Sequence, residues 1–151
     1  MKLEQAIQQS SFTSDDQKLT LNFMYTYNAF KENQKIFFEK YDITMQQFNV
    51  LRILRGNYPK AYTTSQIRDR MLDKMSDASR IVDRLVKKDL VDRKVNSIDK
   101  RLVDVVISDK GLKLLERIDH PLNKHMSEAF TNFSEKEKKE FFQLLNKMRQ
   151  N

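Results

Sequence analysis

The stretch that decides the fold spans residues 76–111 and reads SDASRIVDRLVKKDLVDRKVNSIDKRLVDVVISDKG. Its first part, to about residue 88, places apolar residues such as Ile81 and Leu85 at helical spacing. Two segments rich in β-branched residues follow, 91–95 and 102–107, and the polar residues 96–101 join them. The stretch therefore predicts a helix that is followed directly by a hairpin with a basic tip.

A shorter helix precedes this one. Thr63 and Gln66 have the spacing of a capping box, in which the hydroxyl and the amide side chain satisfy the free backbone groups of the first turn. Ile67 and Met71 then face inward, and the helix is expected to end around Leu72. Two helices joined by so short a turn form a helix-turn-helix, with the hairpin as its wing. Such units most often hold duplex DNA, although winged helices also bind proteins or RNA.

The remaining chain is predicted to be helical. Further capping boxes stand at Ser14/Gln17, Thr44/Gln47 and Ser134/Glu137. They predict a long helix from about 15 to 40, a shorter one that ends near Gly56, and a final helix with its start at Ser134. Ser108 is expected to cap a helix that runs from Asp109 to about 130, with a kink or break at Pro121. The fold class is mainly α with a small β-hairpin wing.

Composition excludes several classes of function. The 151 residues include no Cys and only two Gly, so disulfides, thiolate metal sites and phosphate-binding glycine loops are excluded. No Ser/His/Asp spacing lies at a recognisable turn, and we therefore expect neither an enzyme nor a cofactor. The chain has no basic-then-apolar leader and no apolar run of roughly 18 residues. We expect one cytoplasmic domain, 1–151, without a membrane partner.

The net charge of +7 is concentrated in the middle of the chain. Residues 52–101 hold 14 Lys/Arg against 7 Asp/Glu, whereas the other residues balance. All 15 aromatic residues lie in 12–62 or 130–142. This distribution predicts an electrostatic binding surface on a hydrophobic scaffold. The cations of the predicted surface are Arg80, Arg84, Lys87, Lys88, Arg93, Lys94, Lys100 and Arg101.

In order and spacing, these segments resemble the multiple-antibiotic-resistance regulator (MarR) family of bacterial transcription factors. The likeness covers roughly residues 15–150 and is densest from 43 to 117. The second helix of the family resembles residues 43–51, and its third helix resembles residues 63–71. Its recognition helix, with the exit from that helix, resembles residues 76–91. Asp99-Lys100-Arg101 resembles the Asp-x-Arg signature of the wing, and residues 108–111 resemble the entry to the fifth helix.

The resemblance implies a homodimer that binds double-stranded DNA. Its winged helix-turn-helix lobe is 44–108, and dimerisation helices 12–40 and 109–151 flank it. Arg101 is expected in the minor groove, oriented by a salt bridge from Asp99, and Arg84, Arg93, Lys94 and Lys100 are expected near DNA. We expect Ser76, Asp77, Ser79 and Arg80 to face base edges in the major groove or nearby phosphates. Ser65 and Gln66 are expected to contact the DNA backbone.

The family also differs from this chain at three positions. It usually has Gly where Asp89 stands, at a left-handed helix exit, so we expect some strain or a different shape there. The family favours a small residue at the position where this chain has Arg68. Asp77 is unusual at a DNA-reading position because its charge repels phosphate; it is expected either to accept from cytosine or to hold Arg80 or Arg84 in place.

The terminal helices are expected to form the dimer interface, through Leu19, Phe23, Phe141, Phe142, Leu145 and Met148. By resemblance, a small aromatic effector lodges between the dimer helices and the DNA-binding lobe and releases a repressor from a pseudo-palindromic operator. A weak candidate pocket consists of Tyr25, Tyr27, Phe30 and Phe48, for which core packing is the simpler account.

Two alternatives stay open. One is a winged-helix adaptor whose basic lobe binds an acidic protein. The other is a metal-responsive regulator that uses His120 and His125 with Glu116 or Glu128. Five residues on a helix correspond to a rotation of about 140°, so the two histidines do not share a face of a continuous helix. We therefore assign no metal site.

Overall fold

The computed structural model describes residues 1–150. Its elements follow the order α1 (Leu3–Ala6), α2 (Asp15–Glu39), α3 (Met45–Arg55), β1 (Tyr62–Thr63), α4 (Thr64–Arg70), α5 (Ala78–Lys87), β2 (Val91–Val95), β3 (Val103–Ile107), α6 (Asp109–Glu128) and α7 (Glu135–Met148). The predicted fold class, mainly α with a small β wing, is confirmed. No helix within the described residues is long and apolar enough to cross a membrane.

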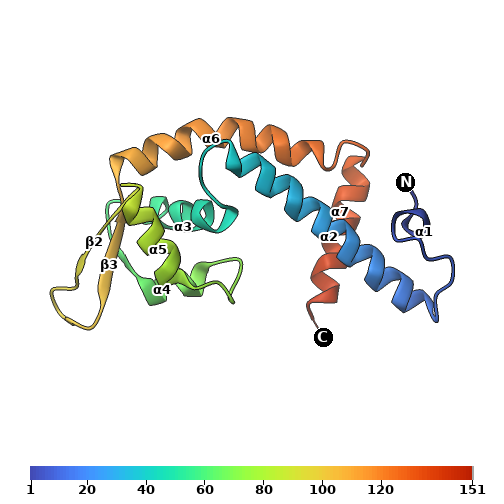
Figure 1. Ribbon diagram of the computed structural model, residues 1–151, viewed down its shortest axis with the longest axis horizontal. Coiled ribbons are helices and arrows are strands. Elements are labelled where there is room, and N and C mark those ends of the chain that lie inside the picture. Colours follow the sequence, from blue (N-terminus) through green and yellow to red (C-terminus); the bar gives the residue numbers. More distant parts are fainter. Residues whose placement is uncertain (151) are drawn as a thin grey trace.

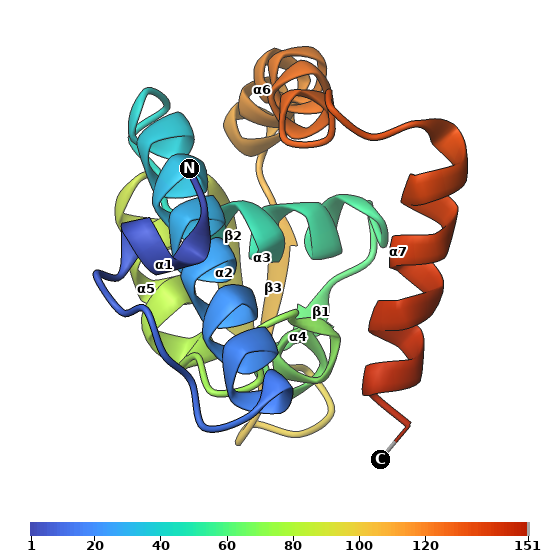
Figure 2. The same ribbon diagram turned by 90° about the vertical axis from the view of Figure 1, so that its right-hand side faces the viewer.

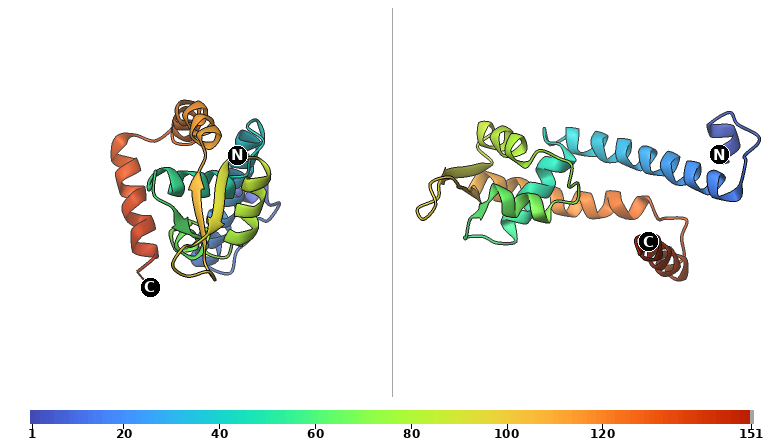
Figure 3. Two further views of the ribbon diagram at one scale, coloured as in Figure 1. Left: turned by 90° about the vertical axis from the view of Figure 1, so that its left-hand side faces the viewer. Right: turned by 90° about the horizontal axis from the view of Figure 1, so that it is seen from below.

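The molecule has a compact lobe at one end and extended helices at the other (Figure 1). The lobe contains α3, α4, α5 and the hairpin of β2 and β3, whose tip projects away from the body. From this lobe α2 and α6 extend in the same direction, as the view from below also shows (Figure 3). The last helix, α7, stands apart from the lobe (Figure 2).

The hydrophobic core lies inside the lobe. Residues with almost no exposed surface come from every element around it, and they include Leu51 and Leu54 of α3, Ile67 of α4, Leu85 of α5, Val105 of β3 and Ile118 of α6. Burial of each such side chain contributes about 1.5–3 kcal/mol, so this cluster is the main source of stability of the lobe. The core therefore fixes the relative positions of α4, α5 and the wing.

Three of the four predicted capping boxes are complete. The hydroxyls of Thr44, Thr63 and Ser134 accept from the backbone N–H three residues on, and each partner side chain accepts from the N–H of the cap residue. The prediction for the fourth box is wrong in one half. Ser14 accepts from the N–H of Gln17, but the Gln17 side chain accepts from the N–H of Thr13, at 2.7 Å.

The sheet has three antiparallel strands in the order β1-β3-β2. Val91 pairs with Ile107 and Val95 with Val103, so the wing is a regular hairpin. The short strand β1 adds Tyr62 opposite Val105. The sequence prediction missed β1, because a two-residue strand directly before a helix cap has no periodicity of its own.

Most predicted helix boundaries agree with the structure, with two corrections. Of the kink or break expected at Pro121, the break does not occur, because α6 continues from Asp109 to Glu128 across this residue. The helix expected to begin at Ser76 begins instead at Ala78. The long helix predicted from about 15 to 40 is confirmed as α2, and Gly56 caps the end of α3 as predicted.

Candidate nucleic-acid interface

Helix α5 has one buried face and one charged face. Ala78, Val82 and Leu85 are buried and anchor the helix in the core. The exposed stripe on the other side consists of Ser79, Arg80, Asp83, Arg84 and Lys87. Three cations against one carboxylate give this stripe a positive surplus. A helix with such a face suits the negative potential of a DNA groove.

The start of α5 is fixed by two aspartates. The Oδ1 atom of Asp77 accepts from the backbone N–H of Arg80 at 3.1 Å, so Asp77 is the N-cap. The hydroxyl of Ser76 donates to Asp73 at 2.7 Å, and this bond lowers the pKa of the Asp73 carboxyl. Asp77 therefore has a structural role in the isolated chain, which the sequence prediction missed because Ser76 is also a good cap residue.

The exit of α5 is a left-handed turn at Asp89, whose φ is 58°. The N–H of Asp89 donates to the carbonyl of Val86 at 2.9 Å, and the N–H of Leu90 donates to that of Leu85 at 3.0 Å. These two bonds form a Schellman motif, which usually has glycine at the left-handed position. The chain thus adopts the helix exit expected from the resemblance, with aspartate in place of glycine.

The wing tip is organised by Asn96 and Asp99. The side-chain oxygen of Asn96 accepts from the backbone N–H groups of Ile98 and Asp99, both at 2.9 Å. The Arg101 guanidinium donates to both carboxylate oxygens of Asp99, at 3.1 and 3.0 Å. This pairing lowers the pKa of Asp99 and raises that of Arg101. The Arg101 side chain stays 89% exposed, so it is oriented and still accessible.

A second ion pair connects α5 to the wing. Arg93 of β2 donates to the carboxylate of Asp83, which lies on the exposed stripe of α5. Both side chains are about half exposed. Arg93 was predicted to lie near DNA, whereas in the structure its guanidinium is engaged within the lobe. The sequence offered no signal for this pair, because the two residues meet only once the strand lies beside the helix.

Helix α4 presents its first turn beside α5. Ser65 and Gln66 are exposed there, and the Gln66 side-chain oxygen is occupied by the N–H of Thr63 at 2.9 Å. The Arg70 guanidinium lies over the ring of Tyr62, 4.4 Å from its centre. Lys94 and Lys100 are exposed on the wing. Helices α4 and α5 and the wing, which carry most of the predicted DNA-facing residues, lie together at one end of the molecule (Figure 1).

Comparisons with known proteins agree with this geometry. The family model described as MarR family matches residues 43–103. The MarR transcription factor from Planctomyces limnophilus is 30% identical, with a TM-score of 0.70, and the match covers 90% of this chain and 98% of that one. The chain belongs to the MarR family. The resemblance inferred from the sequence is confirmed, and the lobe is a winged helix-turn-helix.

The chain is also similar to a transcriptional regulator and, in fold, to a further solved structure. The transcriptional regulator MhqR from Bacillus subtilis is 27% identical over 83% of this chain and 85% of its own length. A mutant MarR from E. coli, solved with operator DNA, has a TM-score of 0.77 at 24% identity, and the match covers 92% of this chain and 99% of that one. The latter likeness shows the shared fold.

The residues expected at the dimer interface of this MarR-family protein lie on α2 and α7. Leu19 and Phe142 are 68% and 65% exposed, and no residue of α7 is buried. Phe23, Phe141 and Met148 are exposed as well, and Leu145 is partly buried. So much accessible apolar surface on two helices is unusual for an isolated soluble chain.

The four residues of the weak effector-pocket prediction are not gathered in one cavity. Phe48 is buried in the core against Phe38, with ring centres 4.8 Å apart. Tyr27 alone of the four lines a groove of about 400 Å³, with Lys31, Met45, Gln46, Asn49, Met71, Leu72 and Asp73. Tyr25 is exposed and Phe30 partly buried. Of the four predicted residues, Tyr27 is therefore the one that lies beside a groove.

The two histidines of this MarR-family protein have different surroundings. His120 is exposed. His125 stacks on the ring of Phe37, with centres 4.6 Å apart, and its Nδ1 lies 3.9 Å from the Glu128 carboxylate. Within residues 1–150, no group of three or more His, Asp or Glu side chains is arranged to hold a metal ion.

Proposed function

We propose that this protein is a homodimeric MarR-type repressor that binds a pseudo-palindromic operator. The observation that carries the proposal is the exposed basic stripe of α5 beside a wing whose Arg101 is oriented by Asp99. The stripe matches the negative potential of a major groove, and an oriented arginine suits the narrow minor groove. The mutant E. coli MarR of the same fold was solved with operator DNA.

The residues divide into three roles. Arg80 and Ser79, at the start of α5, would reach base edges, and Arg84 would reach nearby phosphates. Arg101 enters the minor groove, with Lys94 and Lys100 beside it. Phosphate contacts come from Ser65, Gln66 and Ser76 near the free N–H groups of two helix starts. Asp77 and Arg93 act through the lobe, as a helix cap and as the partner of Asp83.

The exposed apolar faces of α2 and α7 support the proposed dimer. A second copy of the chain offers the same two faces, so a two-fold interface would bury Leu19, Phe23 and Phe142 of both protomers. Two-fold symmetry then places two copies of α5 about one helical turn apart, so the half-sites should be spaced by about 10 base pairs.

An effector that changes this spacing would release the operator. The groove beside Tyr27 lies between α2, α3 and the turn that precedes α5. It combines a phenol, two methionines and Lys31, which suits a small aromatic ligand with a polar substituent. A ligand in this groove would contact both α2 and the DNA-binding lobe. It could therefore change the distance between the two copies of α5 in the dimer.

The test is selection of bound sequences from a random pool of duplex DNA, with Arg101→Ala as the variant. Lys124→Ala is the matched control, because Lys124 is exposed on α6 and lies far from the wing along the chain. We expect an enriched two-fold symmetric motif that the Arg101→Ala protein binds more weakly than the control. Salt-sensitive binding without any motif would contradict the proposal and favour an adaptor that binds an acidic partner.

The dimer is tested separately by analytical ultracentrifugation. The wild-type protein should sediment at twice the mass of the chain, and Phe142→Glu should shift it toward the monomer. Circular dichroism of the variant should stay helical, since Phe142 is 65% exposed and makes no part of the core. A wild-type monomer at micromolar concentration would exclude the two-fold operator.

A further inference from the structure

A second groove of this molecule lies at the exit of α5. It has a volume of about 610 Å³ and is formed by the turn after α2, the end of α5 and the first turns of α6. Sites for small molecules usually have volumes of about 300–1,000 Å³. The groove shares no lining residue with the one beside Tyr27.

The walls of the groove are apolar. Ile43 and Leu90 are buried, Tyr41 and Leu114 are partly buried, and all four line the groove. They come from the three elements that meet here. An apolar body of a ligand would be held between these walls, with loss of its contact with water.

The rim of the groove carries five cations and two carboxylates. Lys110, Lys113 and Arg117 follow each other at intervals of three and four on α6, so they share one face of that helix. Lys87 and Lys88 come from the end of α5, and the carboxylates are those of Asp42 and Asp89. The rim therefore has a positive surplus.

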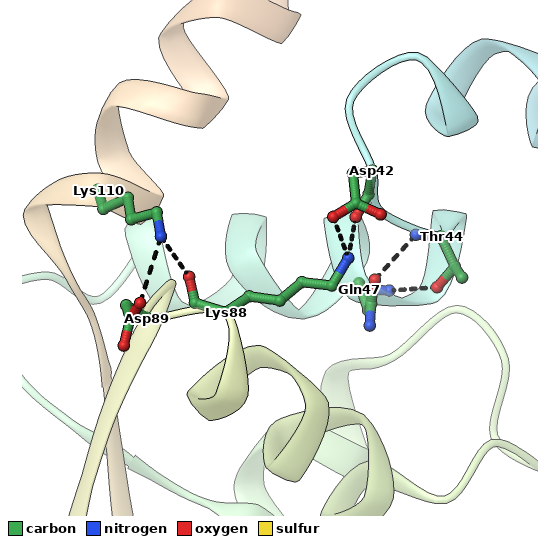
Figure 4. Close-up of polar contacts among 6 residues, drawn as sticks. All are labelled: Asp42, Thr44, Gln47, Lys88, Asp89 and Lys110. Atoms are coloured by element: carbon green, nitrogen blue, oxygen red, sulfur yellow. Dashed lines mark hydrogen bonds and ion pairs between the residues drawn. The ribbon is translucent and has the colours of Figure 1, made fainter.

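Two of the five cations are already engaged (Figure 4). Lys88 binds the carboxylate of Asp42 at 2.8 Å and also donates to the Asp42 carbonyl. Lys110 donates to the carbonyl of Lys88 at 2.8 Å and lies 3.3 Å from the Asp89 carboxylate. Both carboxylates are thus used, and within residues 1–150 no ion pair involves Lys87, Lys113 or Arg117.

The two engaged aspartates also set the shape of the site. Asp42 and Asp89 both adopt left-handed conformations, with φ of 54° and 58°. Each ends a helix, and each is clasped by the lysine of a neighbouring element. The frame of the groove is therefore held by its own ion pairs, while its remaining cations are available to a ligand.

From this arrangement we propose that the groove binds a small organic anion with an apolar body. Arg117 and Lys113 hold the charged head, since a guanidinium can bind a carboxylate or a phosphate through two parallel hydrogen bonds. The body lies against Leu114, Ile43 and Tyr41. Lys87 adds a third cation from the end of α5, so the ligand joins that helix to α6.

The test is titration of the full chain with two anions of matched body, benzoate and phenyl phosphate, followed by the NMR shifts of the Leu90, Lys113 and Arg117 amides. Benzamide supplies the body without charge, and inorganic phosphate supplies the head without the body. We expect saturable shifts with at least one of the two aromatic anions. Benzamide and inorganic phosphate should each bind at least tenfold more weakly. Comparison of benzoate with phenyl phosphate then shows whether the groove prefers a carboxylate or a phosphate group.

The variant is the double substitution Lys113→Gln with Arg117→Gln. Its matched control is Lys124→Gln with Lys139→Gln, which removes the same charge at two exposed positions outside the groove. The first should weaken anion binding at least tenfold, and the second should leave it unchanged. Equal losses in both, or no saturable shift with either aromatic anion, would overturn the proposal.

Operator binding without any added anion provides a further check. If Lys113→Gln with Arg117→Gln weakens operator binding relative to the control, these cations contact DNA phosphates, and the assignment of the groove to a small anion alone is overturned. Unchanged operator binding supports it. Since the NMR titration contains no DNA, it decides the anion site even if the proposed operator function fails.

Discussion

Asp83 of α5 and Arg93 of β2 form an ion pair that connects the helix proposed for the major groove to the first strand of the wing. Both side chains are about half exposed, so solvent screens the pair. We predict a coupling energy of about 0.2–1 kcal/mol in a double-mutant cycle of Asp83→Ala and Arg93→Ala, measured by urea unfolding. A coupling energy of zero would mean that the pair does not order the wing.

The same pair predicts an order of effects on operator affinity. Arg93→Gln should reduce the affinity less than Arg101→Gln, because the Arg93 side chain is only about half exposed beside Asp83, whereas the Arg101 side chain is 89% exposed. Fluorescence anisotropy with a labelled operator measures both. The reverse order would place Arg93 in direct contact with DNA.

Gly111, in the first turn of α6, allows a close approach of the helix to the exit of α5. A Cβ atom there would lie 2.3 Å from the Leu90 carbonyl oxygen and 2.7 Å from Cγ1 of Ile107. We predict that Gly111→Ala lowers the free energy of unfolding by about 3 kcal/mol, since a backbone atom must move.

Gly56→Ala is the matched control for this substitution. Gly56 has ordinary helical dihedral angles, and the nearest atoms to an added Cβ are at 3.5 and 3.6 Å. Its effect should be a gain of about 0.4–1 kcal/mol, because alanine restricts the unfolded chain. Similar losses in both variants under urea would show that steric contact at Gly111 is not decisive.

The left-handed conformation of Asp89 predicts that glycine is better at this position. Asp89→Gly removes strain of about 1–2 kcal/mol, and it loses only an exposed ion pair with Lys110. We expect the glycine variant to gain about 1 kcal/mol in thermal unfolding and Asp89→Ala to lose stability. If alanine is tolerated as well as glycine, the exit of α5 relaxes to another shape.

The sequence predicted those features that depend on local patterns. The caps at Thr44, Thr63 and Ser108 are hydroxyls followed by a helical apolar pattern, and each lies where it was expected. The prediction failed where two neighbouring residues could each make the same local hydrogen bond. Ser76 and Asp77 are both good caps, and the structure uses Asp77. Likewise, the side chain of Gln17 bonds the N–H of Thr13 rather than that of Ser14.

Contacts between distant residues were beyond the reach of such patterns. The pairing of Tyr62 with Val105 and the ion pair between Lys88 and Asp42 exist only in the folded chain. Asp99 and Arg101 are the exception, because the two residues are close in sequence and carry a family signature. The basic helix and wing of the candidate site were therefore predictable, whereas the groove at the exit of α5 was not.

Asp99 provides a prediction on pH. Hydrogen bonds from the Arg101 side chain and backbone lower the Asp99 pKa below its ordinary value of 3.8. Because the folded-state pKa is lowered, the contribution of this pair to wing order is present above that value and is lost as pH falls through the lowered pKa. In an NMR titration, Arg101→Gln should raise the Asp99 pKa toward 3.8. An unchanged pKa would mean that the pair does not form in solution.

Substitutions of Asp77 can distinguish its role as the N-cap of α5 from the effect of its negative charge. Its carboxylate accepts from the Arg80 N–H, and asparagine caps a helix about as well as aspartate. Asp77→Asn should therefore change the free energy of unfolding by less than about 0.5 kcal/mol, whereas Asp77→Ala should cost about 0.5–2 kcal/mol. Urea unfolding of the two variants measures this difference.

The two variants should also differ in operator binding. Asp77→Asn removes a negative charge at the start of the helix proposed for the major groove and should raise the affinity about threefold at low salt, with a smaller gain at high salt. Asp77→Ala removes the same charge but loosens the first turn that presents Ser79 and Arg80, so its gain should be smaller. Lower affinity for Asp77→Asn would mean that the carboxylate accepts from a base, and Asp77 would then be a specificity residue rather than a cap alone.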